Sequence, residues 1–152
     1  MQISIAVVGT AEPSDVASEQ AIAVGAAVAA AGATLLTGGL GGIMEAACRG
    51  AREAGGLTVG ILPGTSKRDA NPYVDCAVPT GLGDFRNYLV VAAADAVIAL
   101  EGRFGTLSEI AMALTLGKRV VGLGTWEIEG VRVVDSAEEA VRVALEAACA
   151  GS

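Results

Sequence analysis

A short apolar run that leads into a glycine turn and a helix start is the strongest constraint on how this chain folds. Residues 97–100 read Val-Ile-Ala-Leu, a pattern typical of a strand that is buried on both faces of a parallel sheet. Gly102 and Gly105 follow and allow a sharp backbone turn. Thr106 then begins an apolar-periodic helix, with Glu109 one turn further along. Free N–H groups and the positive end of the helix dipole meet at such a turn, so the pattern predicts a phosphate or other anion site.

Glu109 has two interpretations at this stage. Its position one turn from the anion site would let it face the rest of a phosphorylated ligand, which makes it a candidate catalytic carboxylate. Thr106 and Glu109 also have the spacing of a capping box, in which both side chains satisfy free N–H groups of the helix. Ser136 and Glu139 share that spacing without a glycine turn and are expected to form only a cap.

Apolar runs and helical patterns alternate through almost the whole chain. We expect strands at residues 3–8, 33–37, 57–62, 74–78, 97–100, 119–123 and 131–134, and helices at residues 13–31, 43–54, 84–94, from 106 and from 136. Asp84 is expected to cap the third helix. The alternation predicts one α/β domain over residues 1–152, a Rossmann-like, doubly wound and mostly parallel sheet of about six or seven strands. The place of the strand at 74–78 stays open, because the loop before it is barely long enough for a parallel crossover.

Composition excludes several classes of function. The net charge is −7 with no basic cluster in the sequence, which argues against a nucleic-acid surface. The chain has no histidine, which excludes catalytic triads that contain histidine, histidine-bound metals and acid–base chemistry by imidazole. Any proton transfer falls mainly to carboxylates, and no metal or resident cofactor is expected. The two lysines, Lys67 and Lys118, lie in a polar loop and at a helix end, where no Schiff-base chemistry is expected.

The remaining composition favours a cytoplasmic protein. Cys48, Cys76 and Cys149 are odd in number and lack a Cys-x-x-Cys spacing, so we expect reduced, apolar filler residues. No signal peptide is recognisable at the N-terminus. The apolar run at residues 21–31 is too short to span a membrane.

A second glycine cluster, Thr37-Gly-Gly-Leu-Gly-Gly-Ile-Met44, also lies between a strand and a helix. Met44 replaces the third glycine of a dinucleotide fingerprint, and tight packing alone can require such glycines. Two glycine loops at one sheet edge nevertheless favour a phosphate site. Arg86 sits in the first turn of its helix, where a cation opposes the dipole. It is either a site residue or an exposed arginine paired with Asp84.

Two helical segments, residues 88–94 and 110–116, are apolar on nearly all sides. Such helices are buried on two faces, and in a chain this short the second face is expected to meet another subunit. The sequence therefore predicts a homodimer or homotetramer.

The chain resembles the superfamily of the Lonely Guy (LOG) phosphoribohydrolases, whose members are often labelled possible lysine decarboxylases. The resemblance rests on Gly38-Gly-x-Gly-Gly-x-Met44, Gly50-Ala-x-x-x-Gly-Gly56, Gly60-Ile-Leu-Pro63, the helix of Arg86, and Gly102-x-x-Gly-Thr-x-x-Glu109. Gly83-Asp-Phe-Arg-Asn87 and Gly105-Thr-Leu-Ser-Glu109 make it most similar to a branch that resembles molybdenum cofactor carrier proteins. The argument from the lysines speaks against a lysine decarboxylase.

The resemblance implies two alternative functions. One is hydrolysis of a nucleoside 5′-monophosphate to free base and ribose 5-phosphate, in which Arg86 orients the substrate and Glu109 activates water or stabilises the transition state. The other is non-catalytic carriage of a phosphorylated nucleotide or pterin, such as molybdenum cofactor. In both, the expected binding residues are Gly9, Thr10, Gly38, Gly39, Gly41, Gly42, Met44, Asn87, Gly102, Arg103, Gly105 and Thr106. Where the enzymes have Pro-Gly-Gly, this chain has Glu101-Gly-Arg103, which places a negative charge near the expected phosphate and a cation beside it.

Overall fold

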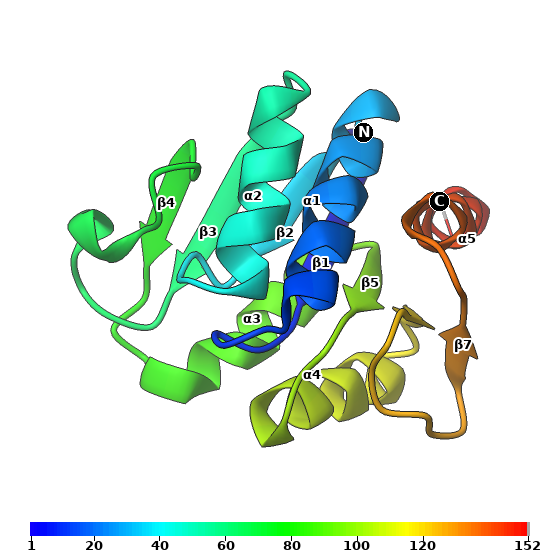
Figure 1. Cartoon of the computed structure of the whole chain (residues 1–152). Helices are drawn as coiled ribbons and strands as arrows, with labels where there is room; N and C mark the ends of the chain where they lie inside the picture. The colour runs from blue at the N-terminus through cyan, green and yellow to red at the C-terminus, as the bar shows by residue number, and fades with distance from the viewer. Residues whose placement is uncertain (152) are drawn as a thin grey trace.

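The computed structural model describes residues 1–151 and contains one seven-stranded sheet (Figure 1). The strand order is β4-β3-β2-β1-β5-β6-β7, and every neighbouring pair is parallel. The strands are β1 (Ser4–Val8), β2 (Thr34–Thr37), β3 (Thr58–Leu62), β4 (Cys76–Pro79), β5 (Ala96–Ala99), β6 (Arg119–Gly122) and β7 (Val131–Val133). The predicted α/β, Rossmann-like fold with a parallel sheet is confirmed.

Within residues 1–151, five α-helices cover the two faces of the sheet. One face carries α1 (Asp15–Ala30), α2 (Ile43–Glu53) and α5 (Ala137–Ala150), and the other carries α3 (Arg86–Ala93) and α4 (Phe104–Thr115). The alternation of side chains along β1 divides the core accordingly. Ile5 and Val7 belong to the cluster with α1, α2 and α5, whereas Ala6 and Val8 pack with α3 and α4.

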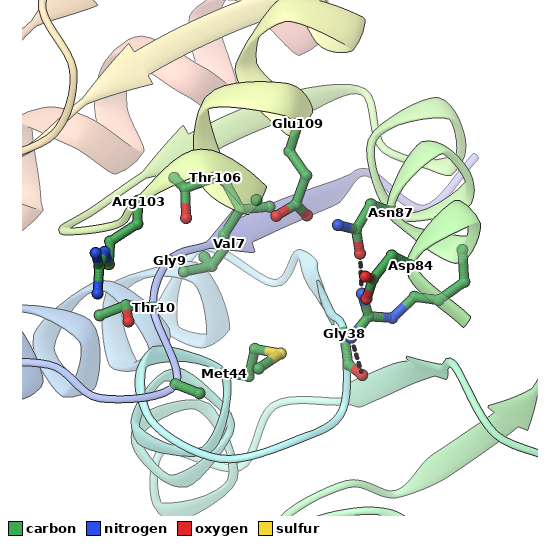
Figure 2. A pocket seen from close by; sticks show the side chains of 14 residues that line it. Val7, Gly9, Thr10, Gly38, Met44, Asp84, Asn87, Arg103, Thr106 and Glu109 are labelled. Carbon is green, nitrogen blue, oxygen red and sulfur yellow. Dashed lines mark hydrogen bonds between the residues drawn. The ribbon is translucent and has the colours of Figure 1, made fainter. Parts of the chain in front are cut away.

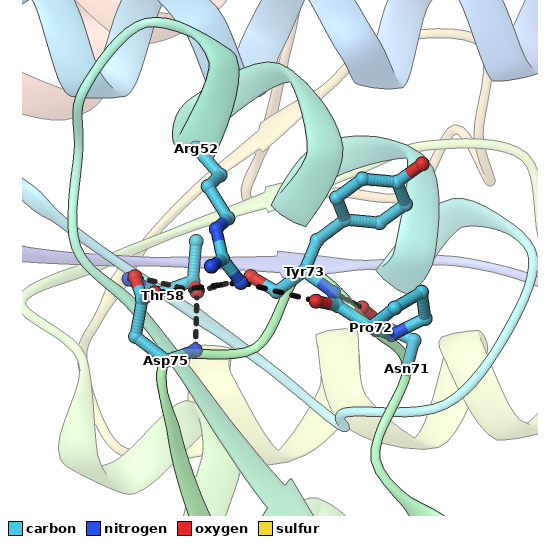
Figure 3. Close-up of polar contacts among 6 residues, drawn as sticks. All are labelled: Arg52, Thr58, Asn71, Pro72, Tyr73 and Asp75. Carbon is cyan, nitrogen blue, oxygen red and sulfur yellow. Dashed lines mark hydrogen bonds and ion pairs between the residues drawn. The ribbon is translucent and has the colours of Figure 1, made fainter.

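The connection from β3 to β4 determines where the fourth strand lies. Residues 63–75 cross over and return β4 parallel to β3 at the edge of the sheet. Arg52 Nη1 donates to Pro72 O at 3.0 Å, and Thr58 Oγ1 donates to Tyr73 O at 2.6 Å (Figure 3). These bonds attach the connection to the end of α2 and the start of β3, so the short crossover is feasible.

Both helices on the α3–α4 face begin differently from the prediction. Asp84 does not cap α3, because a 3-10 turn, η2 (Gly83–Phe85), runs directly into the helix. Phe85 is the N-cap residue of α3, and its backbone is helical, whereas a capping residue normally has an extended backbone. No side chain therefore caps the start of α3. The helix α4 begins at Phe104, two residues before Thr106, with Arg103 as its N-cap.

All three cysteines are free of disulfide bonds, but the expectation that they are apolar filler residues is wrong at two of three positions. Cys48 is fully buried in the core, as predicted. Cys76 and Cys149 are exposed, because Cys76 begins an edge strand and Cys149 lies in the last turn of α5. A second η turn, η1 (Lys67–Asp69), lies in the β3–β4 connection. Across residues 1–151, none of the helices is sufficiently long and apolar to cross a membrane.

Candidate functional site

A pocket of about 280 Å³ opens at the carboxyl ends of β1 and β5. The chain leaves β1 for α1 on one face and β5 for α4 on the other, so the pocket lies at the topological switch point where ligands bind in such sheets. Its lining residues, several shown in Figure 2, are Val7, Val8, Gly9, Thr10, Ala11, Gly38, Met44, Asp84, Arg86, Asn87, Arg103, Gly105, Thr106 and Glu109.

The start of α4 forms one wall with free backbone donors. The first hydrogen bond into the helix runs from Leu107 N to Arg103 O at 3.0 Å. The N–H groups of the three preceding residues therefore have no helical acceptor, and two of those residues, Gly105 and Thr106, line the pocket. A Cβ added at Gly105 would meet no atom within 4 Å. The wall thus offers backbone donors beside open space, as an anion site requires.

Arg86 is buried and fixed in the opposite wall. It is 7% exposed. Its Nε donates to Ile61 O at 2.8 Å, its Nη2 donates to Gly38 O at 3.3 Å, and its Nη1 donates to Asn87 Oδ1. Burial lowers the pKa of the guanidinium, an effect that the charges of Glu109 and Asp84 oppose. The interpretation of Arg86 as an exposed arginine paired with Asp84 is therefore wrong.

Glu109 points into the pocket from the second turn of α4 (Figure 2). The residue is 9% exposed, and burial raises the pKa of its carboxyl to about 8 against the opposing effect of Arg86. The capping-box interpretation is wrong, because Thr106 already lies inside the helix and the N-cap makes no side-chain bond. At neutral pH the carboxyl is mostly protonated and can donate a hydrogen bond to a ligand.

Glu101 turns away from the pocket. One of its carboxylate oxygens, Oε2, accepts hydrogen bonds from Ser14 N at 3.0 Å and from Ser14 Oγ at 2.8 Å, and these bonds lower the pKa of Glu101. The backbone of the same residue accepts from Thr10 N at 2.8 Å. The negative charge therefore stabilises the start of α1 and the pocket-lining loop before it. Arg103 remains in the pocket lining with an exposed side chain.

The second glycine loop contributes less to the lining than expected. Gly38 and Met44 line the pocket, together with Gly9, Thr10 and Asn87. Four predicted binding residues lie outside the lining: Gly39, Gly41, Gly42 and Gly102.

Packing within the protein explains why glycine is needed at two of the positions outside the lining, Gly39 and Gly42. Gly42 has a φ of +67° and an added Cβ would lie 2.4 Å from Thr10 O, while Gly39 has a φ of +76° and would meet Leu62 at 2.5 Å. Both glycines are required by the chain's own packing, and their part in ligand binding stays a prediction.

Sequence reasoning missed Val7, Val8, Ala11 and Asp84 as lining residues. Asp84 stands two positions before Arg86, and this proximity is the one feature of the sequence that points to Asp84 as a lining residue. Among residues 1–151, no group of three or more histidine, cysteine, aspartate or glutamate side chains could hold a metal ion. Lys118 Nζ donates to Ala92 O at 3.1 Å and to Ala94 O at 2.6 Å, away from the pocket lining.

One family model and one known protein are similar to this chain along nearly its whole length. The model of the SLOG cluster4 family matches residues 2–149. A protein of Archaeoglobus fulgidus described as uncharacterized is 44% identical over 141 residues, which cover 91% of this chain and 92% of that protein.

Two solved structures are similar along nearly the whole chain. The molybdenum cofactor binding protein of Rippkaea orientalis is 34% identical with a TM-score of 0.91, covering 96% of this chain and 97% of that one. The molybdenum cofactor carrier protein of Chlamydomonas reinhardtii is 31% identical with a TM-score of 0.90, covering 98% and 99%.

Proposed function

The chain belongs to the SLOG cluster4 family, and on this premise we propose that it binds and carries a small phosphorylated ligand, a pterin phosphate of the molybdenum cofactor type or a nucleotide. The observation that carries the proposal is the pocket at the β1–β5 switch point, which is lined by the start of α4 with its free N–H groups, by Arg86 and by Glu109. The similar proteins from Rippkaea and Chlamydomonas bind or carry molybdenum cofactor, which supports a carrier.

The charges in the pocket suit an anion. Arg86 and Arg103 are cations, Asp84 is an anion, and Glu109 is mostly uncharged at neutral pH because its pKa is raised to about 8. The lining is therefore positive in a chain whose net charge is −7. A phosphate at the start of α4 would gain both the helix dipole and this local charge.

The protonation of Glu109 and the hydrogen bonds of Arg86 favour ligand binding over hydrolysis. A carboxyl with a pKa near 8 serves as a hydrogen-bond donor at pH 7 more readily than as a base that activates water. Arg86 already donates three hydrogen bonds inside the protein. Its role in the proposal is to fix the wall and supply charge, with its remaining N–H groups available to the ligand.

Hydrolysis of nucleoside 5′-monophosphates is the second candidate. The observation in its favour is that Arg86 and Glu109, the pair implied by the resemblance to LOG enzymes, line the same pocket. In this case Glu109 must ionise to act as a base, so the rate should increase as the pH rises towards 8.

One experiment separates the two functions. The purified chain is first analysed by native mass spectrometry for a ligand that co-purifies. It is then titrated with AMP, GMP and N6-modified AMP by calorimetry, and the mixtures are analysed for free base and ribose 5-phosphate. A bound pterin phosphate, or tight nucleotide binding without product, supports the carrier. Product formed by the wild type and abolished in Glu109→Gln, with Glu138→Gln as the exposed control, would establish the hydrolase instead.

A further inference from the structure

A second groove, also of about 280 Å³, lies between α5 and the strands β6 and β7. In Figure 1, β7 and α5 stand at the edge of the molecule opposite β4. The groove is lined by three arginines, one glutamate and three apolar residues: Arg119, Arg132, Arg142, Glu146, Val143, Ala147 and Ala150. It shares no lining residue with the candidate pocket.

The strand register places two of these arginines on one face of the sheet. Arg132 on β7 pairs with Val121 on β6, and Arg119 lies two residues before Val121. Side chains two residues apart on a strand share a face, and paired residues of neighbouring strands do so as well. Val121 belongs to the core cluster with α5, so both arginines are on the α5 face. The fold thus builds a basic cluster from residues that are far apart in the sequence.

The groove contains more positive than negative charge. Arg142 is paired with Glu146 at 2.7 Å and lies 3.9 Å from Glu139. Arg119 and Arg132, in the described part of the chain, have no carboxylate within 4 Å. Both arginines are exposed on neighbouring strands, so an anion that binds between them would be attracted by two cations. This local charge is opposite in sign to the net charge of the whole chain.

We propose that this groove binds a small anion with at least two phosphate groups, at a site separate from the candidate pocket. Guanidinium groups bind phosphate through two parallel N–H bonds, and each of the two unpaired arginines comes from a different strand, so two phosphate groups can be held at once. Ala147 and Ala150 have small side chains on the α5 side, which leaves room for the anion.

The test is an NMR titration of the ¹⁵N-labelled full chain with inorganic pyrophosphate at constant ionic strength. The expected result is a saturable shift of amide resonances from residues 119–122, 131–133 and 142–150. Any binding in the candidate pocket is recognised separately by shifts at residues 103–109. The double variant Arg119→Gln/Arg132→Gln should raise the Kd for the groove by roughly tenfold or more, because two charge-assisted interactions are lost.

Two further variants separate recognition from general charge effects. Arg68→Gln removes an exposed arginine from η1, in the β3–β4 connection, and should leave the Kd of the groove unchanged. Arg119→Lys/Arg132→Lys keeps the charge but loses the bidentate hydrogen bonds of the guanidinium groups. We therefore expect its Kd to lie between those of the wild type and the double glutamine variant.

Three results would overturn the proposal. The first is the absence of saturable shifts in the groove up to millimolar pyrophosphate. The second is an equal shift in the wild type and in the double glutamine variant. The third is binding of a hexaglutamate peptide but not of pyrophosphate, which would identify the groove as a surface for acidic polypeptides.

Discussion

Arg86 and Glu109 face one pocket from two helices, and no ion pair joins them. Three of the N–H groups of Arg86 are directed to Ile61 O, Gly38 O and Asn87 Oδ1. The positive charge therefore offsets only part of the desolvation of Glu109, and the pKa of that carboxyl rises to about 8. A fixed guanidinium and a mostly neutral carboxyl together form a wall suited to an anionic ligand.

Glu109→Gln should change the pH dependence of stability. Because the folded-state pKa of about 8 exceeds the ordinary value of 4.5, the folded chain binds more protons than the unfolded chain between these values. The contribution of Glu109 to the free energy of unfolding is fully present below about pH 4.5 and is lost as the pH rises to about 8. Chemical denaturation from pH 4.5 to 9 should show that the variant lacks this decline.

The control for this prediction is Glu138→Gln, an exposed residue in the first turn of α5. Its stability profile should keep the decline seen in the wild type. If Glu109→Gln declines as steeply as the wild type, Glu109 is not the titrating group. Affinity for an anionic ligand should likewise weaken in the wild type as the pH rises through 8, because ionised Glu109 repels the anion.

Gly105→Ala should stabilise the fold and weaken ligand binding. Residue 105 is in α4, and its added Cβ meets no protein atom within 4 Å. Alanine is favoured over glycine in a helix by about 0.5–1 kcal/mol, but the new methyl group would enter the pocket. We expect a higher Tm and a Kd raised about tenfold, or about 1.4 kcal/mol, measured by thermal unfolding and calorimetry.

Gly102→Ala is the matched comparison. Its Cβ would lie 2.0 Å from Thr106 Oγ1, so the helix start must shift and the Tm should fall. A Gly105→Ala variant that binds as tightly as the wild type would exclude the start of α4 as the binding wall.

Glu101→Ala should loosen the loop that precedes α1. The carboxylate of Glu101 accepts from Ser14 N and Ser14 Oγ, and the loop includes the pocket residues Thr10 and Ala11. Hydrogen exchange at Ser14 and Ala17 should become faster in this variant, because the N-cap loses its partner. Glu101→Gln retains an acceptor oxygen and should show a smaller change. Equal exchange in all three proteins would contradict the role assigned to Glu101.

Leu89→Glu should disrupt the predicted homo-oligomer. Leu89 and Tyr88 on α3 are 37% and 45% exposed, and Leu116, which follows α4, is 38% exposed. These apolar side chains lie on the outer face that the sequence predicts to be covered by another subunit. Light scattering should give a dimer or tetramer for the wild type and a smaller mass for Leu89→Glu. Leu57→Glu, at another exposed leucine, should keep the wild-type mass, and a monomeric wild type would contradict the prediction.

The overall fold could be predicted because its signals are local. The apolar run of β5 is completely buried, and Ser136 Oγ caps α5 by accepting from Glu139 N at 3.2 Å, as expected. The alternation of strands and helices also predicts that Arg86, Gly105 and Glu109 lie at the carboxyl edge of the sheet, and all three line the pocket there, although Gly105 lies in the first turn of α4 and not in a turn before it.

Other features depend on contacts that are distant in the sequence. The direction of Glu101 is determined by Ser14, which is 87 residues away. The burial of Arg86 depends on carbonyl groups after β2 and in β3. The arginine groove depends on the register of β6 and β7. None of these partners is recognisable from local spacing.

The position of a bound phosphate tests the central claim most directly. A crystal of the chain soaked in AMP should show the phosphate at the start of α4, with oxygens accepting from the N–H groups of Gly105 and Thr106 at about 2.7–3.2 Å. Arg86 and Glu109 should face the rest of the ligand across the pocket. An AMP phosphate that binds in the pocket away from the start of α4, or AMP that binds only outside the pocket, would contradict the account.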